Sequence, residues 1–151
     1  MDVLKEVKKE HKELKSLISK IEKSKDLKAK RDLFEEFYSY LKAHHDAEEE
    51  VIFPKVKEEA NKDGKETVLE MIEEHHLGGY QLSLLDRTSM ENDTWDAKFS
   101  VLKEVVTHHM DEEESDFIPL AREILTENDT SDMYSKFEKV VSKNKKEYMK
   151  K

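Results

Sequence analysis

A segment with two polar residues on one helical face occurs twice in the sequence, as LKAHHDAEEEVIFP at 41–54 and VTHHMDEEESDFIP at 106–119. When the two prolines are aligned, each copy has a histidine followed four residues later by a glutamate: His44 with Glu48, and His109 with Glu113. Residues separated by four positions lie one turn apart on the same face of a helix. If both copies face one core, imidazoles and carboxylates meet there, and this pattern predicts a metal site.

The repeat extends beyond these segments. Residues 4–21 align with residues 68–85, which places His75 on His11 and Glu74 on Glu10. Each half of the chain is therefore predicted to contain a helix with one histidine, followed by a helix with His-x-x-x-Glu. Two such hairpins related by a pseudo-twofold axis predict an all-α, up-down-up-down four-helix bundle.

The repeated histidines and glutamates lie in phase with apolar residues spaced by three and four positions. In the second predicted helix this stripe is Leu33, Phe37, Leu41, His44, Glu48, Ile52 and Val56. A buried carboxylate without a partner costs several kcal/mol, so it must be paired, protonated or bound to a metal. The predicted metal ligands are His11, His44, Glu48, His75, His109 and Glu113.

The pattern predicts one domain over residues 1–151, with the bundle at about 2–125 and a short C-terminal helix at about 131–148. The first helix is expected at about 2–24 and the second at about 27–60, with a kink at Pro54 just after the site. The third helix is expected to begin close to Gly64 and the fourth after Thr94, and residues 127–130 are expected to form a loop.

Several neighbouring residues remain alternatives because histidines and glutamates occur in runs. Replacing His75 by His76 in the alignment would break the match of apolar residues between the two halves. The open alternatives, as ligands or as residues that support ligands, are His45, His76, Tyr80, Glu49 and Glu114.

Composition limits the possible chemistry and partners. The chain has no cysteine, which excludes thiolate metal sites and disulfides. Imidazoles and carboxylates without sulfur suit iron, manganese or zinc. The net charge of −9 leaves no basic stripe for nucleic acid or an anionic membrane. The charged N-terminus and the absence of long apolar runs lead us to expect a cytoplasmic protein.

The two repeated segments, together with Glu-His at 10–11 and 74–75, resemble the hemerythrin-like (HHE cation-binding) family over about residues 3–125. The resemblance implies a non-haem di-iron centre with an oxo or hydroxo bridge, with manganese or zinc less expected. By position it implies the same six ligands.

The sequence departs from the oxygen-carrying members of that family. They have a further histidine four residues after the ligand of the third helix, where this chain has Gly79. Their last carboxylate is an aspartate five residues after its histidine, whereas Glu113 follows at four. The resemblance then implies a more symmetric and open centre that binds or reacts with dioxygen, peroxide or nitric oxide, with an electron donor if it turns over.

Two alternative functions follow from the same resemblance, and whether the protein is an enzyme is left open. One is an iron or oxygen sensor or an iron-storage module without turnover. The other is repair of iron centres under nitrosative stress, although repair proteins usually carry an additional cysteine-bearing domain.

Overall fold

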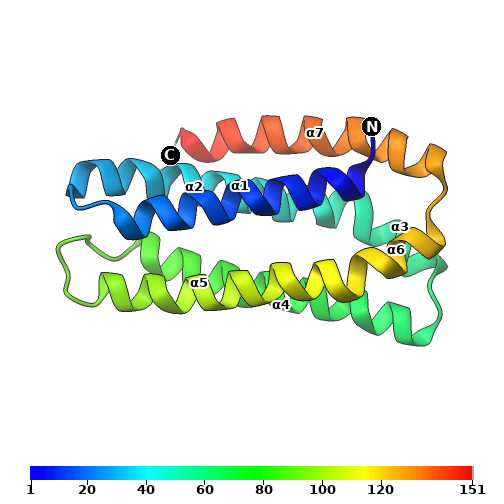
Figure 1. The fold of residues 1–151 in the computed structure, drawn as a ribbon, viewed down its shortest axis with the longest axis horizontal. Coiled ribbons are helices and arrows are strands. Elements are labelled where there is room, and N and C mark those ends of the chain that lie inside the picture. The colour runs from blue at the N-terminus through cyan, green and yellow to red at the C-terminus, as the bar shows by residue number, and fades with distance from the viewer. Residues whose placement is uncertain (151) are drawn as a thin grey trace.

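The computed structural model describes residues 1–150 as helices joined by short turns, and no strand occurs within that range (Figure 1). The α-helices are α1 (Val3–Lys23), α2 (Leu27–Ala47), α3 (Phe53–Glu59), α4 (Lys62–Asp86), α5 (Trp95–Glu112), α6 (Ile118–Ile124) and α7 (Glu127–Met149). Two π-helical segments, η1 (Glu48–Ile52) and η2 (Glu113–Phe117), join α2 to α3 and α5 to α6.

The long helices alternate in direction, as the sequence repeat predicts. Figure 1 shows α1 and α2 as one antiparallel hairpin and α4 and α5 as a second hairpin beside it. The all-α, up-down-up-down four-helix bundle is therefore confirmed. Helix α7 lies along α2 and α1 on the side of the first hairpin that faces away from the second (Figure 1).

Side-chain caps fix where α1, α2, α4 and α7 begin, since the first backbone N–H groups of a helix have no partner within it. Asp2 accepts from the backbone of Leu4 and Lys5 at the start of α1, and Asn61 accepts from Gly64 at the start of α4. Thr126 and Asp129 form a reciprocal capping box at the start of α7.

That capping box overturns one prediction. The expected loop at 127–130 is wrong, because these residues form the first turn of α7. The C-terminal helix is also not short, since it contains 23 residues. Asp46 of α2 accepts hydrogen bonds from Asn144 and Tyr148, which anchor the far end of α7 to the bundle.

In the second and fourth helices of the bundle, a π-helical turn replaces regular α-helix just before the proline, which in the second helix is where a kink was expected. Each π-segment starts at a predicted ligand, Glu48 or Glu113. The helical run expected over about 27–60 is present as α2, η1 and α3, but it departs from α-helical hydrogen bonding at Glu48, before Pro54 is reached. Pro54 and Pro119 are each the second residue of the helix that follows, a position where the missing N–H costs little. Single π-turns inside helices are frequent at functional sites.

Aromatic residues pack on both sides of the region where the predicted ligands lie. Towards one end of the bundle, Trp95 stacks on Phe99 with ring centroids 5.4 Å apart and meets Phe34 edge-on. Towards the other end, Phe53 and Phe117 meet edge-on at 5.0 Å. These buried rings place large apolar surfaces on either side of the predicted ligands.

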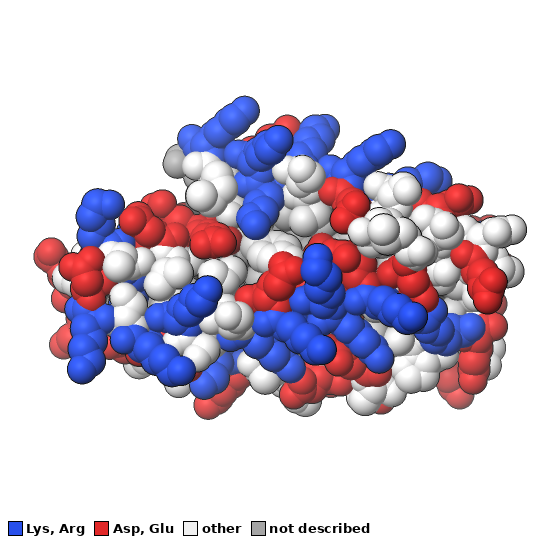
Figure 2. Space-filling model, turned by 45° about the horizontal axis from the view of Figure 1, so that its top comes forward, with Lys and Arg blue, Asp and Glu red and all other residues white. Residues whose placement is uncertain are grey.

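Charged side chains cover the outside of the helices. On the face drawn in Figure 2, lysines and arginines are interspersed with aspartates and glutamates. Within residues 1–150, no helix is long and apolar enough to cross a membrane.

We predict that Phe137→Ala will destabilise the protein by about 3–5 kcal/mol, because the Phe137 ring is fully buried between α7 and the bundle and meets the His44 ring edge-on. Chemical denaturation measures this change. Met149→Ala, near the exposed end of the same helix, is the control and should change stability by at most about 0.5 kcal/mol. Equal effects of the two substitutions would show that α7 is not an integral part of the fold.

Candidate metal centre

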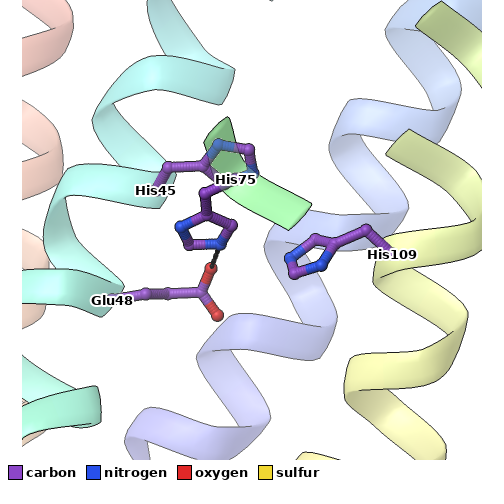
Figure 3. A group of neighbouring side chains, drawn as sticks. All are labelled: His45, Glu48, His75 and His109. Carbon is purple, nitrogen blue, oxygen red and sulfur yellow. Dashed lines mark ion pairs between the residues drawn. The ribbon is translucent and has the colours of Figure 1, made fainter. Parts of the chain in front are cut away.

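All six predicted ligands converge in the middle of the bundle. His11 comes from α1, His44 from α2, Glu48 from η1, His75 from α4, His109 from α5 and Glu113 from η2. Each of these residues is at most 4% exposed. Figure 3 shows His75, His109 and Glu48 pointing towards one another from different helices. The arrangement follows from the sequence pattern, since the six residues are in phase with the apolar core.

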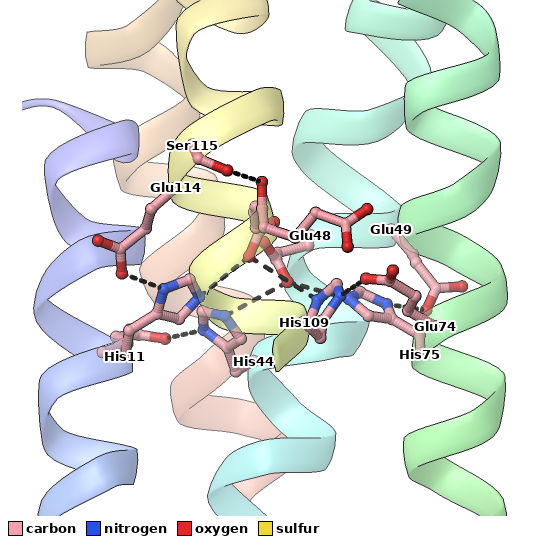
Figure 4. Close-up of polar contacts among 12 residues, drawn as sticks. His11, His44, Glu48, Glu49, Glu74, His75, His109, Glu114 and Ser115 are labelled. Carbon is pink, nitrogen blue, oxygen red and sulfur yellow. Dashed lines mark hydrogen bonds and ion pairs between the residues drawn. The ribbon is translucent and has the colours of Figure 1, made fainter. Parts of the chain in front are cut away.

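The Nε2 atoms of the four histidines face the carboxylates of Glu48 and Glu113. Figure 4 shows the four imidazoles gathered around Glu48. The distances from Nε2 to the carboxylate oxygen are 3.3 Å for His44–Glu48, 3.2 Å for His75–Glu48, 3.0 Å for His11–Glu113 and 3.9 Å for His109–Glu113. Each of the two central glutamates thus lies between a histidine of the first hairpin and a histidine of the second.

These inward-facing atoms are buried without hydrogen bonds. Within residues 1–150, neither oxygen of Glu48 and neither oxygen of Glu113 has a hydrogen-bond partner, although imidazoles lie close to them. The same is true of the four Nε2 atoms that face them. Leaving one buried polar group unpaired costs about 1–3 kcal/mol, and more if it is charged. A cation that binds all of these atoms would remove that cost, so the residues fit a metal centre.

The outward-facing nitrogen of each histidine is bound by a further glutamate (Figure 4). The Nδ1–carboxylate distances are 2.7 Å for His44–Glu10, 2.7 Å for His109–Glu74, 2.8 Å for His75–Glu49 and 2.7 Å for His11–Glu114. When Nδ1 donates to a carboxylate, the ring orientation is fixed and the lone pair of Nε2 points to the centre. This is the usual outer support of a histidine that binds a metal.

The supporting glutamates connect the helices in two ways. Glu10 of α1 binds a histidine of α2, and Glu74 of α4 binds one of α5, so these two contacts lie within a hairpin. Glu49 and Glu114 instead bind histidines of the opposite hairpin. The repeat alignment placed Glu10 on Glu74, but it did not reveal their role, because each binds a histidine of another helix and not its neighbour in sequence.

The two central carboxylates have pKa values shifted in opposite directions. Burial and the negative charge of Glu48 raise the pKa of Glu113. Burial also opposes ionisation of Glu48, but the His44 charge helps to lower the pKa of Glu48 well below its usual value. Two buried carboxylates this close do not both ionise unless positive charge accompanies them. The centre therefore favours bound cations.

Two of the central imidazoles have raised pKa values in the metal-free centre. Burial opposes protonation of His44, but Glu48 and Glu10 outweigh it and raise the pKa of His44 well above its usual value. Burial likewise opposes protonation of His75, but Glu48 and Glu49 raise its pKa to about 9. Metal binding at these nitrogens must displace protons.

Two overlapping groups of side chains are close enough to hold a metal ion each. In each group, ligand atoms from its four residues all lie within 4.8 Å of one another. The first group is His11, His44, Glu48 and Glu113, and the second is His45, Glu48, His75 and His109. Glu48 belongs to both groups, so it could serve as a ligand in either of them.

The structure distinguishes the alternatives that the sequence left open. His76 and Tyr80 are about two-thirds exposed and lie outside the centre. Gly79 borders open space, because a Cβ placed on it would have no neighbouring atom within 4 Å. Glu49 and Glu114 support histidines from outside.

His45 is buried, and its ring stacks on that of His75. Burial and the neighbouring His75 and His109 lower the pKa of His45 well below its usual value and keep this ring neutral. The doubled histidine at 44–45 was the only signal of His45 in the sequence.

We predict that the metal-free protein will be less stable at pH 9 than at pH 6.5. Folding raises the pKa of His75 from 6.5 to about 9, because its protonated ring is stabilised by neighbouring glutamates. The contribution of this protonated ring to folding stability is therefore complete below about pH 6.5 and is lost as the pH rises towards 9. Thermal unfolding of chelator-treated protein measures this change. His76→Gln should retain the pH dependence and His75→Gln should weaken it, whereas a metal-free protein that gains stability over this range would contradict the assignment.

Comparisons with known proteins identify the family and the fold. The family model described as "Hemerythrin HHE cation binding domain" matches residues 2–121, and the match ends before α7 begins. An uncharacterized hemerythrin-like protein of Schizosaccharomyces pombe is 28% identical over 131 residues, which are 87% of this chain. The chain spans only 64% of the length of that relative.

A solved structure has the same fold. The crystal structure of a hemerythrin HHE cation binding domain-containing protein from Mycobacterium kansasii superposes with a TM-score of 0.84 and covers 97% of this chain and 89% of its own. At 23% sequence identity this similarity establishes the fold alone. The match of the family model over most of the chain shows more: the protein belongs to the hemerythrin HHE cation binding domain family.

Proposed function

We propose that this protein holds two iron ions between Glu48 and Glu113 and that the centre binds or reacts with a small ligand, namely dioxygen, peroxide or nitric oxide. The observation that carries the proposal is the cluster of inward-facing imidazole nitrogens and carboxylate oxygens, which are buried in the bundle without hydrogen bonds. Such a cluster has no evident structural use, because apolar side chains of similar size would fill the same space at lower cost.

The donor set supports iron as the metal. Imidazoles and carboxylates without sulfur suit iron, manganese and zinc, and carboxylate-rich sites in helical bundles commonly bind pairs of iron ions. When bound, iron would supply the redox and Lewis-acid chemistry that activates a small ligand. The outer glutamates orient the imidazoles, and the buried aromatic rings on either side keep bulk water out.

The first experiment is anaerobic loading with ferrous iron followed by exposure to air. We expect about two irons per chain and a new near-ultraviolet charge-transfer absorption. Glu48→Ala should bind little iron because Glu48 belongs to both groups of ligands, and His76→Ala, on the exposed side of α4, should load like the wild type. Iron content near zero in the wild type after loading would contradict the proposal.

A second candidate function is that of a sensor or iron-storage module without turnover. The observation in its favour is the burial of Glu48 and Glu113, each 0% exposed. Because buried carboxylates need a cation to offset their charge, the folding stability of the protein should depend on bound metal, as a sensor requires. Steady consumption of peroxide or nitric oxide in the presence of a reductant would support chemistry at the centre. Metal-dependent stability without any turnover would support the second candidate.

We predict that Glu74→Gln will lower iron affinity by roughly 10–100-fold, because an amide oxygen accepts the Nδ1–H of His109 more weakly than the carboxylate does. Competition with a chelator of known affinity measures this loss. Glu73→Gln changes the same charge one residue away, at a side chain that is 76% exposed, and should leave the affinity unchanged. If the two variants bind iron equally, Glu74 has no role in supporting the site.

A further inference from the structure

The two halves of the centre differ at one buried position. The alignment that places His109 on His44 also places Met110 on His45, and both side chains are buried. The first hairpin therefore contributes an additional imidazole where the second contributes a thioether. Every other ligand and every supporting glutamate described above has a counterpart of its own type in the other half.

The additional imidazole lies against the ligands of one metal position. The His45 ring stacks on the His75 ring with centroids 3.7 Å apart, and it meets the His109 ring edge-on at 5.6 Å. A ring nitrogen of His45 lies within 4.8 Å of ligand atoms of Glu48, His75 and His109. Figure 3 shows the four side chains close together, with the His45 ring lying against the His75 ring. His45 is not part of the group formed by His11, His44, Glu48 and Glu113.

A purely structural role does not account for His45. Within residues 1–150 its Nε2 atom is buried without a hydrogen-bond partner, which is unfavourable for a polar atom removed from water. Met110 occupies the equivalent position in the second hairpin and is 1% exposed, so an apolar side chain packs well in this environment. An imidazole at this position is therefore costly unless its free nitrogen binds something.

We propose that His45 is a third imidazole ligand of the metal position formed by Glu48, His75 and His109, so that the two metal positions of this centre are unequal. This inference rests on the proposed function. One position then has three imidazoles and a carboxylate, and the other has two imidazoles and two carboxylates. The pseudo-twofold symmetry of the fold is broken by a ligand on α2.

The inequality has a consequence for metal loading. Imidazoles favour later divalent ions such as Co²⁺ and Zn²⁺, whereas carboxylates favour harder ions such as Mn²⁺. The position that includes His45 should therefore bind the first equivalent of Co²⁺. The second equivalent should enter the position of His11 and His44 with lower affinity.

The test is an anaerobic titration of the metal-free protein with Co²⁺ against a competing chelator, followed by visible absorption. We expect two separate binding steps for the wild type. His45→Met, which copies the second hairpin, should weaken the first step by roughly tenfold or more and bring the two steps together. His76→Met is the matched control at an exposed histidine of α4 and should retain both steps.

Met110→His tests the same idea by gain of a ligand and does not depend on the folding of the first variant. It should strengthen the weaker step, because it offers a third imidazole to the other position. Two equal steps in the wild type, or a first step unchanged by His45→Met in a protein with wild-type circular dichroism, would overturn the inference while the proposed function stands. A wild type that binds no Co²⁺ and no iron would overturn the proposed function itself.

Discussion

The rest of the structure must offset the unfavourable free energy of burying Glu48 and Glu113 in the core of a helical bundle. Both carboxylates are fully buried, and within residues 1–150 none of their oxygens has a hydrogen-bond partner. The imidazole nitrogens around them also lack hydrogen bonds, which adds to this cost. A stable fold can retain such a cluster if a cation binds it, or if the rest of the core supplies enough apolar burial to tolerate it. The aromatic packing on both sides of the site provides that burial, and the donor atoms favour the cation.

The supporting glutamates link the metal chemistry to the assembly of the bundle. Two of them bind histidines within a hairpin, and two bind histidines of the opposite hairpin. Each imidazole is thus held between an outer carboxylate and the centre, and the rings cannot turn away without breaking a charge-assisted hydrogen bond. The π-turns begin at the central glutamates themselves, so the backbone changes its hydrogen-bonding pattern at the point where these side chains enter the site.

Much of this architecture is predictable from the sequence because the chain contains an internal repeat. The apolar spacing predicts four long helices, and the repeat alignment selects His75 over His76. What the sequence does not predict depends on contacts between helices. Glu10 and Glu74 lie next to histidines in sequence but bind histidines of other helices. The π-turns change the backbone hydrogen bonds without interrupting the apolar pattern, and the capping box at Thr126 was concealed in a polar stretch.

The central claim is that the buried cluster is a site for two metal ions. Anomalous diffraction from crystals of the iron-loaded protein tests it most directly. The account predicts two iron peaks in the core, one on each side of Glu48, with the imidazoles turned towards them. Peaks confined to surface carboxylates and histidines, such as the partly exposed group of Glu74, His108 and Glu112, or the absence of any peak, would contradict it.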